Sequence, residues 1–113
     1  MPSQAFSGTE TIGTTEWSLT TDTSGPDAET TAGTYQAFVD ASALTAADLY
    51  LLRIYEKTTG SGDTQRLFGS FTIRGGGDPG FITAALILLH GWDMTLQKLA
   101  GTDRSITWSI RTP

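Results

Sequence analysis

The side chain best suited to acid–base chemistry in this 113-residue chain is its single histidine, His90. A Ser-His-Asp relay needs an imidazole between a carboxylate and a hydroxyl nucleophile, and Asp93 lies close to His90 in the sequence. However, Gly91 follows His90 directly in a segment typical of a turn, so we interpret the histidine as a turn residue. A transition-metal site needs more ligands than one imidazole, and the chain has no cysteine. We therefore expect no catalytic residue, no metal site and no cofactor.

Carboxylates are the second group with catalytic potential. Glycoside hydrolysis needs two acids held at a fixed separation across a sugar-binding cleft. The aspartates that could serve fall instead in predicted turns, where Asp hydrogen-bonds to local backbone: Asp22, Asp27, Asp63, Asp78 and Asp103. They also lack the D-x-D-x-D-G spacing of a calcium loop. We therefore predict that these residues build turns and that the chain is not an enzyme.

The run Gly75-Gly76-Gly77-Asp78-Pro79-Gly80 invites comparison with phosphate-binding loops. Such a loop ends in GK[ST] and leads into a helix, whose first N–H groups bind the phosphate. Neither the GK[ST] ending nor a clearly capped helix follows here. The run therefore predicts a flexible connection between two strands.

Charge and hydropathy narrow the function classes further. The net charge of −5 and an isoelectric point near 4.5 disfavour nucleic acid and anionic membranes, because binding to phosphate needs a basic surface. The first four residues are uncharged and no apolar run follows them, unlike a secretory signal peptide. The longest apolar run, Ala84–Leu89, is too short to span a membrane. We expect a protein made in the cytoplasm that binds neither nucleic acid nor membrane.

Composition and periodicity together predict an all-β chain. Threonine and glycine are abundant, whereas the Lys and Glu that usually cover helices are scarce. Apolar and polar residues alternate in four segments that we expect to be strands: Thr15–Thr21, Thr34–Ala41, Leu49–Thr58 and Gln65–Arg74. In the last of these, we expect Leu67, Phe71 and Ile73 to point inward.

The connections between the expected strands follow from turn-forming residues. Asp22–Gly33 reads as a long loop, Ser42–Ala47 as a link with room for one helical turn, and Gly60–Asp63 as a hairpin turn. Residues 1–13 form either an irregular edge strand or an extended N-terminal arm. We predict one domain spanning residues 1–113, an antiparallel β-sandwich or small jelly roll of about seven or eight strands.

The clearest alternation lies in the last part of the chain. Apolar residues recur at every second position on both sides of Ala100–Asp103: Trp92, Met94 and Leu96 before it, and Ile106, Trp108 and Ile110 after it. A period of two places one face of each strand in the core. We predict a β-hairpin with one buried face, which includes Trp92 and Trp108.

The segment Phe81–Leu89 carries the strongest functional signal. It could be a short buried helix, but the turn at His90-Gly91 favours a strand that pairs with the one after it. Such a strand would be apolar on both faces and would leave Phe81, Ile87 and Leu89 in an exposed patch, unless the N-terminal arm or the Asp22–Gly33 loop covers it. We predict a protein–protein interface made by five residues, for self-association: Phe81, Ile87, Leu89, Phe6 and Trp17.

Exposed aromatic residues support an alternative function. Sugar rings stack on aromatic faces, and three aromatic residues outside the predicted hairpin could provide them: Trp17, Tyr35 and Tyr55. This alternative predicts a module that binds a surface glycan.

Two segments, Ala37–Lys57 and Leu86–Arg111, resemble small accessory proteins of tailed-bacteriophage particles. The run HGWDMTLQKLAGTDRSITWSI is the most specific part, and the N-terminal third carries no resemblance. The resemblance implies a non-enzymatic virion protein of the capsid cement or decoration type, β-rich and homotrimeric. It would be made in the host cytoplasm and bind the phage major capsid protein on the capsid exterior. The same resemblance suits a minor tail protein or a receptor-binding tail module, and it implies no particular functional residues.

Overall fold

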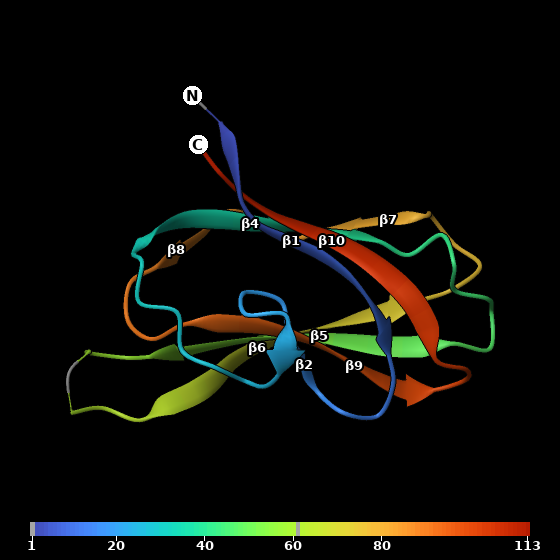
Figure 1. Ribbon diagram of the computed structural model, residues 1–113, viewed down its shortest axis with the longest axis horizontal. Helices are drawn as coiled ribbons and strands as arrows, with labels where there is room; N and C mark the ends of the chain where they lie inside the picture. The colour runs from blue at the N-terminus through green and yellow to red at the C-terminus, as the bar shows by residue number, and fades with distance from the viewer. Residues whose placement is uncertain (1, 61) are drawn as a thin grey trace.

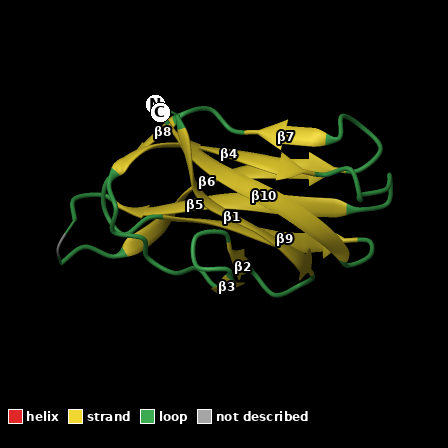
Figure 2. Ribbon diagram, turned by 45° about the horizontal axis from the view of Figure 1, so that its top comes forward, coloured by secondary structure: helices red, strands yellow, loops and turns green. Residues whose placement is uncertain are grey.

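The computed structural model describes residues 2–60 and 62–113, and over these residues it contains strands and no helix (Figures 1 and 2). The predicted all-β antiparallel sandwich is confirmed, with ten strands because several are very short. In chain order they are β1 (Ser3–Ile12), β2 (Trp17–Ser18), β3 (Thr23–Ser24), β4 (Gly33–Asp40), β5 (Leu49–Lys57), β6 (Gln65–Arg74), β7 (Gly80–Ile82), β8 (Leu86–Leu88), β9 (Asp93–Ala100) and β10 (Arg104–Thr112).

Two antiparallel sheets form the sandwich. The first has the strand order β1-β10-β4-β7, and β8 also pairs with β4. The second has the order β3-β2-β9-β5-β6. In Figure 1, β4, β10 and β1 lie in one layer, and β9, β5 and β6 lie in the other. The inner faces supply the core, because alternate side chains of each strand point toward the opposite sheet.

The predicted hairpin at the end of the chain is wrong. β9 pairs with β2 and β5, whereas β10 pairs with β1 and β4, so the turn between them crosses from one sheet to the other. The two apolar stripes of that segment, including Trp92 and Trp108, are buried and belong to opposite faces of the core. A period of two specifies which face of a strand is buried, but it does not specify which strand lies beside it.

The hairpin of β5 and β6 is confirmed, although its turn includes Ser61, which lies outside the described residues. A bulge interrupts the register, since Ile54 pairs with Gly69 but Tyr55 pairs with Leu67. Phe68 is therefore the extra residue on β6. The bulge moves Leu67 to the face of Tyr55, so the prediction that Leu67 points inward is wrong.

The prediction of one continuous strand at Phe81–Leu89 is also wrong. The segment forms β7 and β8, which pair with opposite ends of β4, and Thr83 lies between them. The buried Thr83 hydroxyl accepts a hydrogen bond from the Ala37 N–H at 3.0 Å, and the Thr83 N–H donates to the Ala37 carbonyl. This interruption changes the phase of the alternation. Phe81 therefore points inward, whereas Ile82 and Ile87 are exposed.

The next connection crosses between sheets as well. β8 lies in the sheet of β4, and β9 lies in the other sheet, so the predicted pairing of Phe81–Leu89 with the strand that follows does not form. His90 and Gly91 make the expected turn, with φ of 53° at Gly91.

The N-terminal segment is an edge strand. Residues from Ser3 to Ile12 pair with β10, with a register shift between Gln4 and Phe6. Of the two alternatives considered for residues 1–13, the irregular edge strand is the one that forms. The first residues of β1 and the last residues of β10 extend together beyond the sandwich (Figure 1).

Three other expectations need adjustment. The strand expected at Thr15–Thr21 is reduced to β2, and the loop expected at Asp22–Gly33 contains the short strand β3. The described link at Ser42–Ala47 contains turns and no helical turn.

Candidate functional site

Two of the predicted interface residues pack against the core. Phe6 is half-buried, and its ring centroid lies 5.7 Å from that of Trp92 and 6.2 Å from that of Tyr35. Trp17 is also half-buried, and its indole N–H donates to Asp22 Oδ1 at 2.9 Å. Both aromatic side chains already have packing partners within the chain.

The other three predicted residues lie along one side of the sandwich. Ile87 is 76% exposed and Leu89 is 49% exposed. Phe81 is half-buried, with its ring centroid 6.1 Å from that of Phe71 on the facing sheet. The structure thus brings Phe81 against β6 and leaves Ile87 and Leu89 in water.

Several exposed apolar residues on this side were not among the predicted interface residues. Phe68 is 60% exposed, and Leu67, Phe71 and Ile82 are also exposed. We call the six exposed apolar residues of β6 and of the segment 82–89 the apolar rim: Leu67, Phe68, Phe71, Ile82, Ile87 and Leu89. The sequence did contain a sign of exposed apolar residues on β6, namely the adjacent pair Leu67-Phe68. Two consecutive large apolar residues break the period of two, so one of them must point away from the core.

Two sets of contacts connect the second sheet with the segments that carry the rim residues of the first sheet. The rings of Phe71 and Phe81 connect β6 with β7. At the other end, Glu56 Oε2 accepts hydrogen bonds from the backbone N–H of Leu89 at 2.6 Å and of His90 at 2.9 Å. Glu56 lies opposite Arg66 in the backbone register of β5 and β6. The rim residues lie on more than one face: Ile82 and Ile87 belong to the outer face of the first sheet, whereas Leu67 shares the face of Tyr55 in the second.

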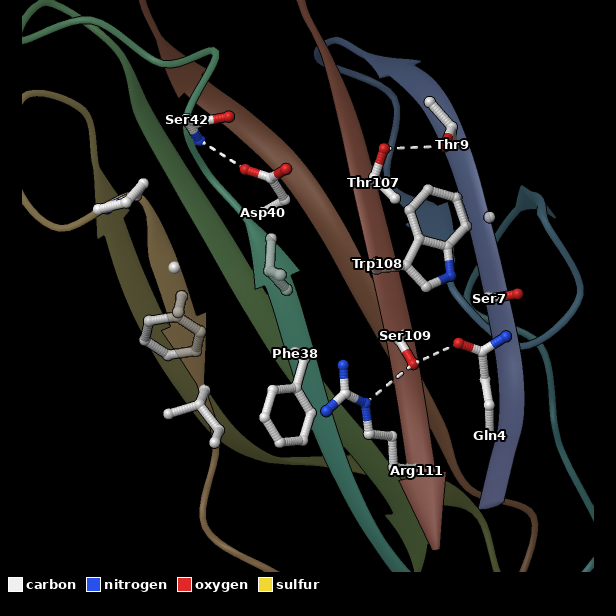
Figure 3. Close-up of a pocket in the computed structure, with 16 residues that line it drawn as sticks. Gln4, Ser7, Thr9, Phe38, Asp40, Ser42, Thr107, Trp108, Ser109 and Arg111 are labelled. Carbon is white, nitrogen blue, oxygen red and sulfur yellow. Dashed lines mark hydrogen bonds between the residues drawn. The ribbon is translucent and has the colours of Figure 1, made fainter. Parts of the chain in front are cut away.

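A shallow groove of about 1000 Å³ lies on the outer face of the first sheet (Figure 3). Its lining comes from β1, β10, β4 and β7 and includes Ser7, Phe38, Asp40, Ile82 and Thr107. Figure 3 shows the hydroxyls of Thr9 and Thr107 bonded to each other, at 2.8 Å. Hydroxyl groups are common here because the outward positions of β1 and β10 include Ser7, Thr9, Thr107 and Ser109.

Arg111 is held in a defined position at one end of the groove. Its guanidinium carbon lies 3.7 Å from the centroid of the Phe38 ring. Arg111 Nε donates to Ser109 Oγ at 3.3 Å, and that hydroxyl donates to Gln4 Oε1 at 2.8 Å. At the opposite end, hydrogen bonds from the side chain and from the backbone N–H of Ser42 keep the pKa of Asp40 below its usual value. The groove can therefore donate hydrogen bonds to, and accept them from, a polar ligand.

The aromatic residues considered for glycan binding do not line this groove. Tyr35 is buried, and its hydroxyl donates to the Thr31 carbonyl at 3.0 Å. The hydroxyl of Tyr55 donates to Glu16, and burial together with this carboxylate raises the pKa of Tyr55 to about 12. The prediction that Tyr35 presents a face to a sugar is wrong, because the ring belongs to the core.

The pKa values of two buried aspartates are shifted in opposite directions by their surroundings. Asp48 accepts hydrogen bonds from the N–H groups of Thr45 and Thr102 and from Arg104 Nε, each at 2.8 Å, and these bonds lower its pKa. Asp93 is deeply buried, and desolvation raises its pKa. The carboxylate oxygens of both residues are occupied by donors of the chain, which favours a structural role for both.

His90 shows no arrangement for acid catalysis or metal binding within the described part of the chain. Its neighbour in sequence, Asp93, is buried and accepts hydrogen bonds from Thr20, Asp27 and Met94. Over residues 2–60 and 62–113, no group of three His, Asp or Glu side chains could hold a metal ion. Over the same residues, no helix could cross a membrane.

No protein-family model, curated protein or solved structure matches this chain. The apolar rim and the groove are therefore the two features from which a function can be argued.

Proposed function

We propose that this chain is a non-enzymatic structural protein that works by binding other proteins, as a cement or decoration protein of a phage capsid. The apolar rim is the observation that carries the proposal. Exposed apolar patches on a folded domain mark interaction surfaces, and Ile82 and Ile87 share the outer face of the first sheet. The segments that resemble phage accessory proteins give the proposal its specific form.

Burial of the exposed rim side chains would contribute to binding. Burying apolar surface contributes about 25 cal/mol per Å². Large aliphatic and aromatic side chains such as those of Phe68 and Ile87 would therefore contribute several kcal/mol, from which the entropy lost on association must be subtracted. Multiple copies on a capsid lattice would then reinforce one another.

In this proposal the chain self-associates, as a homotrimer, through the part of the rim on the first sheet. Ile82, Ile87 and Leu89 are the exposed residues of that part. The trimer would contact neighbouring major-capsid subunits on the capsid exterior and resist their separation.

Removal of apolar surface tests this proposal. We expect the double substitution Ile87→Ser and Leu89→Ser to reduce the mass in solution to that of a monomer and to weaken binding to empty capsids. Leu99→Ser is the matched control, because Leu99 is 50% exposed but lies outside the rim. Sedimentation and capsid binding are the measurements. A parent chain that is monomeric at high concentration and does not bind capsids would refute the proposal.

The groove supports a second candidate function, in which a tail or receptor-binding module binds glycan. Its hydroxyls and the guanidinium of Arg111 suit a polyhydroxylated or acidic sugar. We expect Arg111→Gln to abolish such binding on a glycan array, with Arg74→Gln as the control on the other sheet. If the parent chain binds no glycan, this candidate is excluded.

A further inference from the structure

Strand β6 leaves one edge of the second sheet without a neighbour. It pairs with β5, and over the described residues its other edge pairs with no strand. An edge strand of ten residues is long enough to direct the pairing of another chain. Long edges are usually protected by proline, a cover, charged side chains or a bulge. β6 has no proline, its bulge lies at Phe68, and the run Gly69–Arg74 beyond the bulge pairs with β5 in regular register.

Two hydrogen bonds identify the β6 residues whose backbone groups face outward. The Lys57 N–H donates to the His90 carbonyl on the β9 side, and the Gly75 N–H donates to the Asp48 carbonyl on the β6 side. Successive residues of a strand direct their backbone groups to alternate sides. Given the register of β5 and β6, the N–H groups of Ser70 and Thr72 point to the free edge.

The charge of β6 is opposite to that of the whole chain. The chain has a net charge of −5, but β6 contains Arg66, Arg74 and no acidic residue. Both arginine side chains are exposed, and neither makes an ion pair within the described part of the chain. A cation therefore stands near each end of the exposed edge, with Leu67, Phe68 and Phe71 between them.

This pattern disfavours a second copy of β6 as the neighbour. In antiparallel pairing centred on Ser70, the bulge at Phe68 offsets Arg66 from Arg74, and β6 offers neither arginine a carboxylate partner. In parallel pairing in register, each arginine would lie opposite itself. The parallel arrangement opposes like charges, which destabilises a sheet, and the antiparallel arrangement leaves all four arginines without a charge partner.

We propose that β6 binds an extended segment of another protein, which adds to the sheet as its next strand. That segment carries a carboxylate opposite Arg66 and another opposite Arg74, with apolar residues between them. Backbone hydrogen bonds supply the attachment, and the two ion pairs set the register and select the partner. This inference rests on one part of the proposed function, namely that the chain works by binding another protein.

A synthetic peptide as long as β6 is the probe for this site. It alternates Thr and Val and carries a glutamate opposite each arginine, and the control peptide carries lysines at the same two positions. We expect the glutamate peptide to bind at least about tenfold more tightly, with an affinity that falls as salt is added. Equal binding of the two peptides, or no binding of either, would overturn the inference.

Two variants test the strand-addition geometry and the charge selection separately. Thr72→Pro removes an outward N–H group, whereas Thr72→Ala keeps it, so only the proline variant should lose peptide binding. Arg66→Glu combined with Arg74→Glu should reverse the preference toward the lysine peptide, which also excludes unfolding as the cause. Unchanged preference in the charge variant would overturn the inference.

The same variants separate this inference from the proposed function. If Thr72→Pro binds empty capsids as the parent does, the capsid role stands and β6 is not its contact. If Thr72→Pro prevents self-association while Thr72→Ala does not, the occupant of β6 is a second copy, and the inference is wrong.

Discussion

The carboxylate of Asp48 occupies the space that a side chain at Gly101 would need. A Cβ atom at Gly101 would lie 2.1 Å from Asp48 Oδ1, and Gly101 has a φ of 91°. Asp48 also accepts hydrogen bonds from Thr102 and Arg104 just beyond this glycine. The buried carboxylate and the bare glycine together hold the turn that carries the chain from β9 in one sheet to β10 in the other.

We predict that Gly101→Ala is strongly destabilising. The substitution adds a Cβ that collides with Asp48 and forces a non-glycine residue to adopt a positive φ. Gly62→Ala is the matched control, because Gly62 has a φ of 86° but open space around its Cβ position. Thermal unfolding should show a loss of about 1 kcal/mol for Gly62→Ala and at least about 3 kcal/mol for Gly101→Ala. Equal losses would show that the collision is relieved without cost.

We predict that Asp48 makes the protein less stable in acid. Its pKa is lowered in the folded state, so its contribution is complete above the ordinary carboxyl pKa and is lost as the pH falls through the folded value. Asp48→Asn should therefore destabilise the protein at neutral pH and flatten the decline of stability in acid. Urea unfolding over a range of pH is the measurement, with Asp78→Asn in the exposed glycine-rich connection as control. Parallel pH profiles for the parent and Asp48→Asn would contradict this prediction.

We predict that Asp93 has the opposite effect on the pH dependence of stability. Burial raises its pKa, so the stability it contributes is complete below the ordinary carboxyl pKa and is lost as the pH rises through the folded value. The Thr20 hydroxyl donates to Asp93 Oδ1 at 2.8 Å and stabilises the charged form. Thr20→Val should lower the free energy of unfolding by about 1–2 kcal/mol at neutral pH and by less in acid.

A second threonine variant provides the control for Thr20→Val. Thr9 bonds to the hydroxyl of Thr107 on the exposed outer face of the first sheet. Thr9→Val should therefore show a small loss that does not depend on pH. If Thr20→Val lowers the free energy of unfolding equally at acid and neutral pH, the Thr20 hydroxyl does not stabilise the charged form of Asp93.

Local periodicity was enough to predict the fold class but not the topology. The alternation around Trp92 and Trp108 correctly placed both side chains in the core. The alternation could not show whether the two strands are neighbours in one sheet or face each other from opposite sheets. In both arrangements one face of each strand is buried. The decisive interactions are long-range, such as the bonds of Asp48 with the turn before β10, and they leave no local pattern in the sequence.

The candidate site was predictable only in part, for similar reasons. Exposure of Ile87 and Leu89 followed from an excess of apolar residues in one short segment. The bulge at Phe68 and the interruption at Thr83 each change the phase of a strand by one residue. A shift of one residue exchanges the buried and exposed faces of a strand. The unbroken alternation therefore did not predict that Leu67 and Ile82 are exposed.

We predict a late ionisation of the tyrosines in the folded protein. Burial, with Glu16 nearby, raises the pKa of Tyr55 to about 12, and burial also raises the pKa values of Tyr35 and Tyr50. Stability supplied by Tyr55 is complete below pH 10 and is lost as the pH rises through about 12. Glu16→Gln removes the charge and should lower the pKa of Tyr55, whereas Glu10→Gln should not. Ultraviolet titration of single-tyrosine variants measures both effects, and an unchanged Tyr55 pKa in Glu16→Gln would show that burial alone sets it.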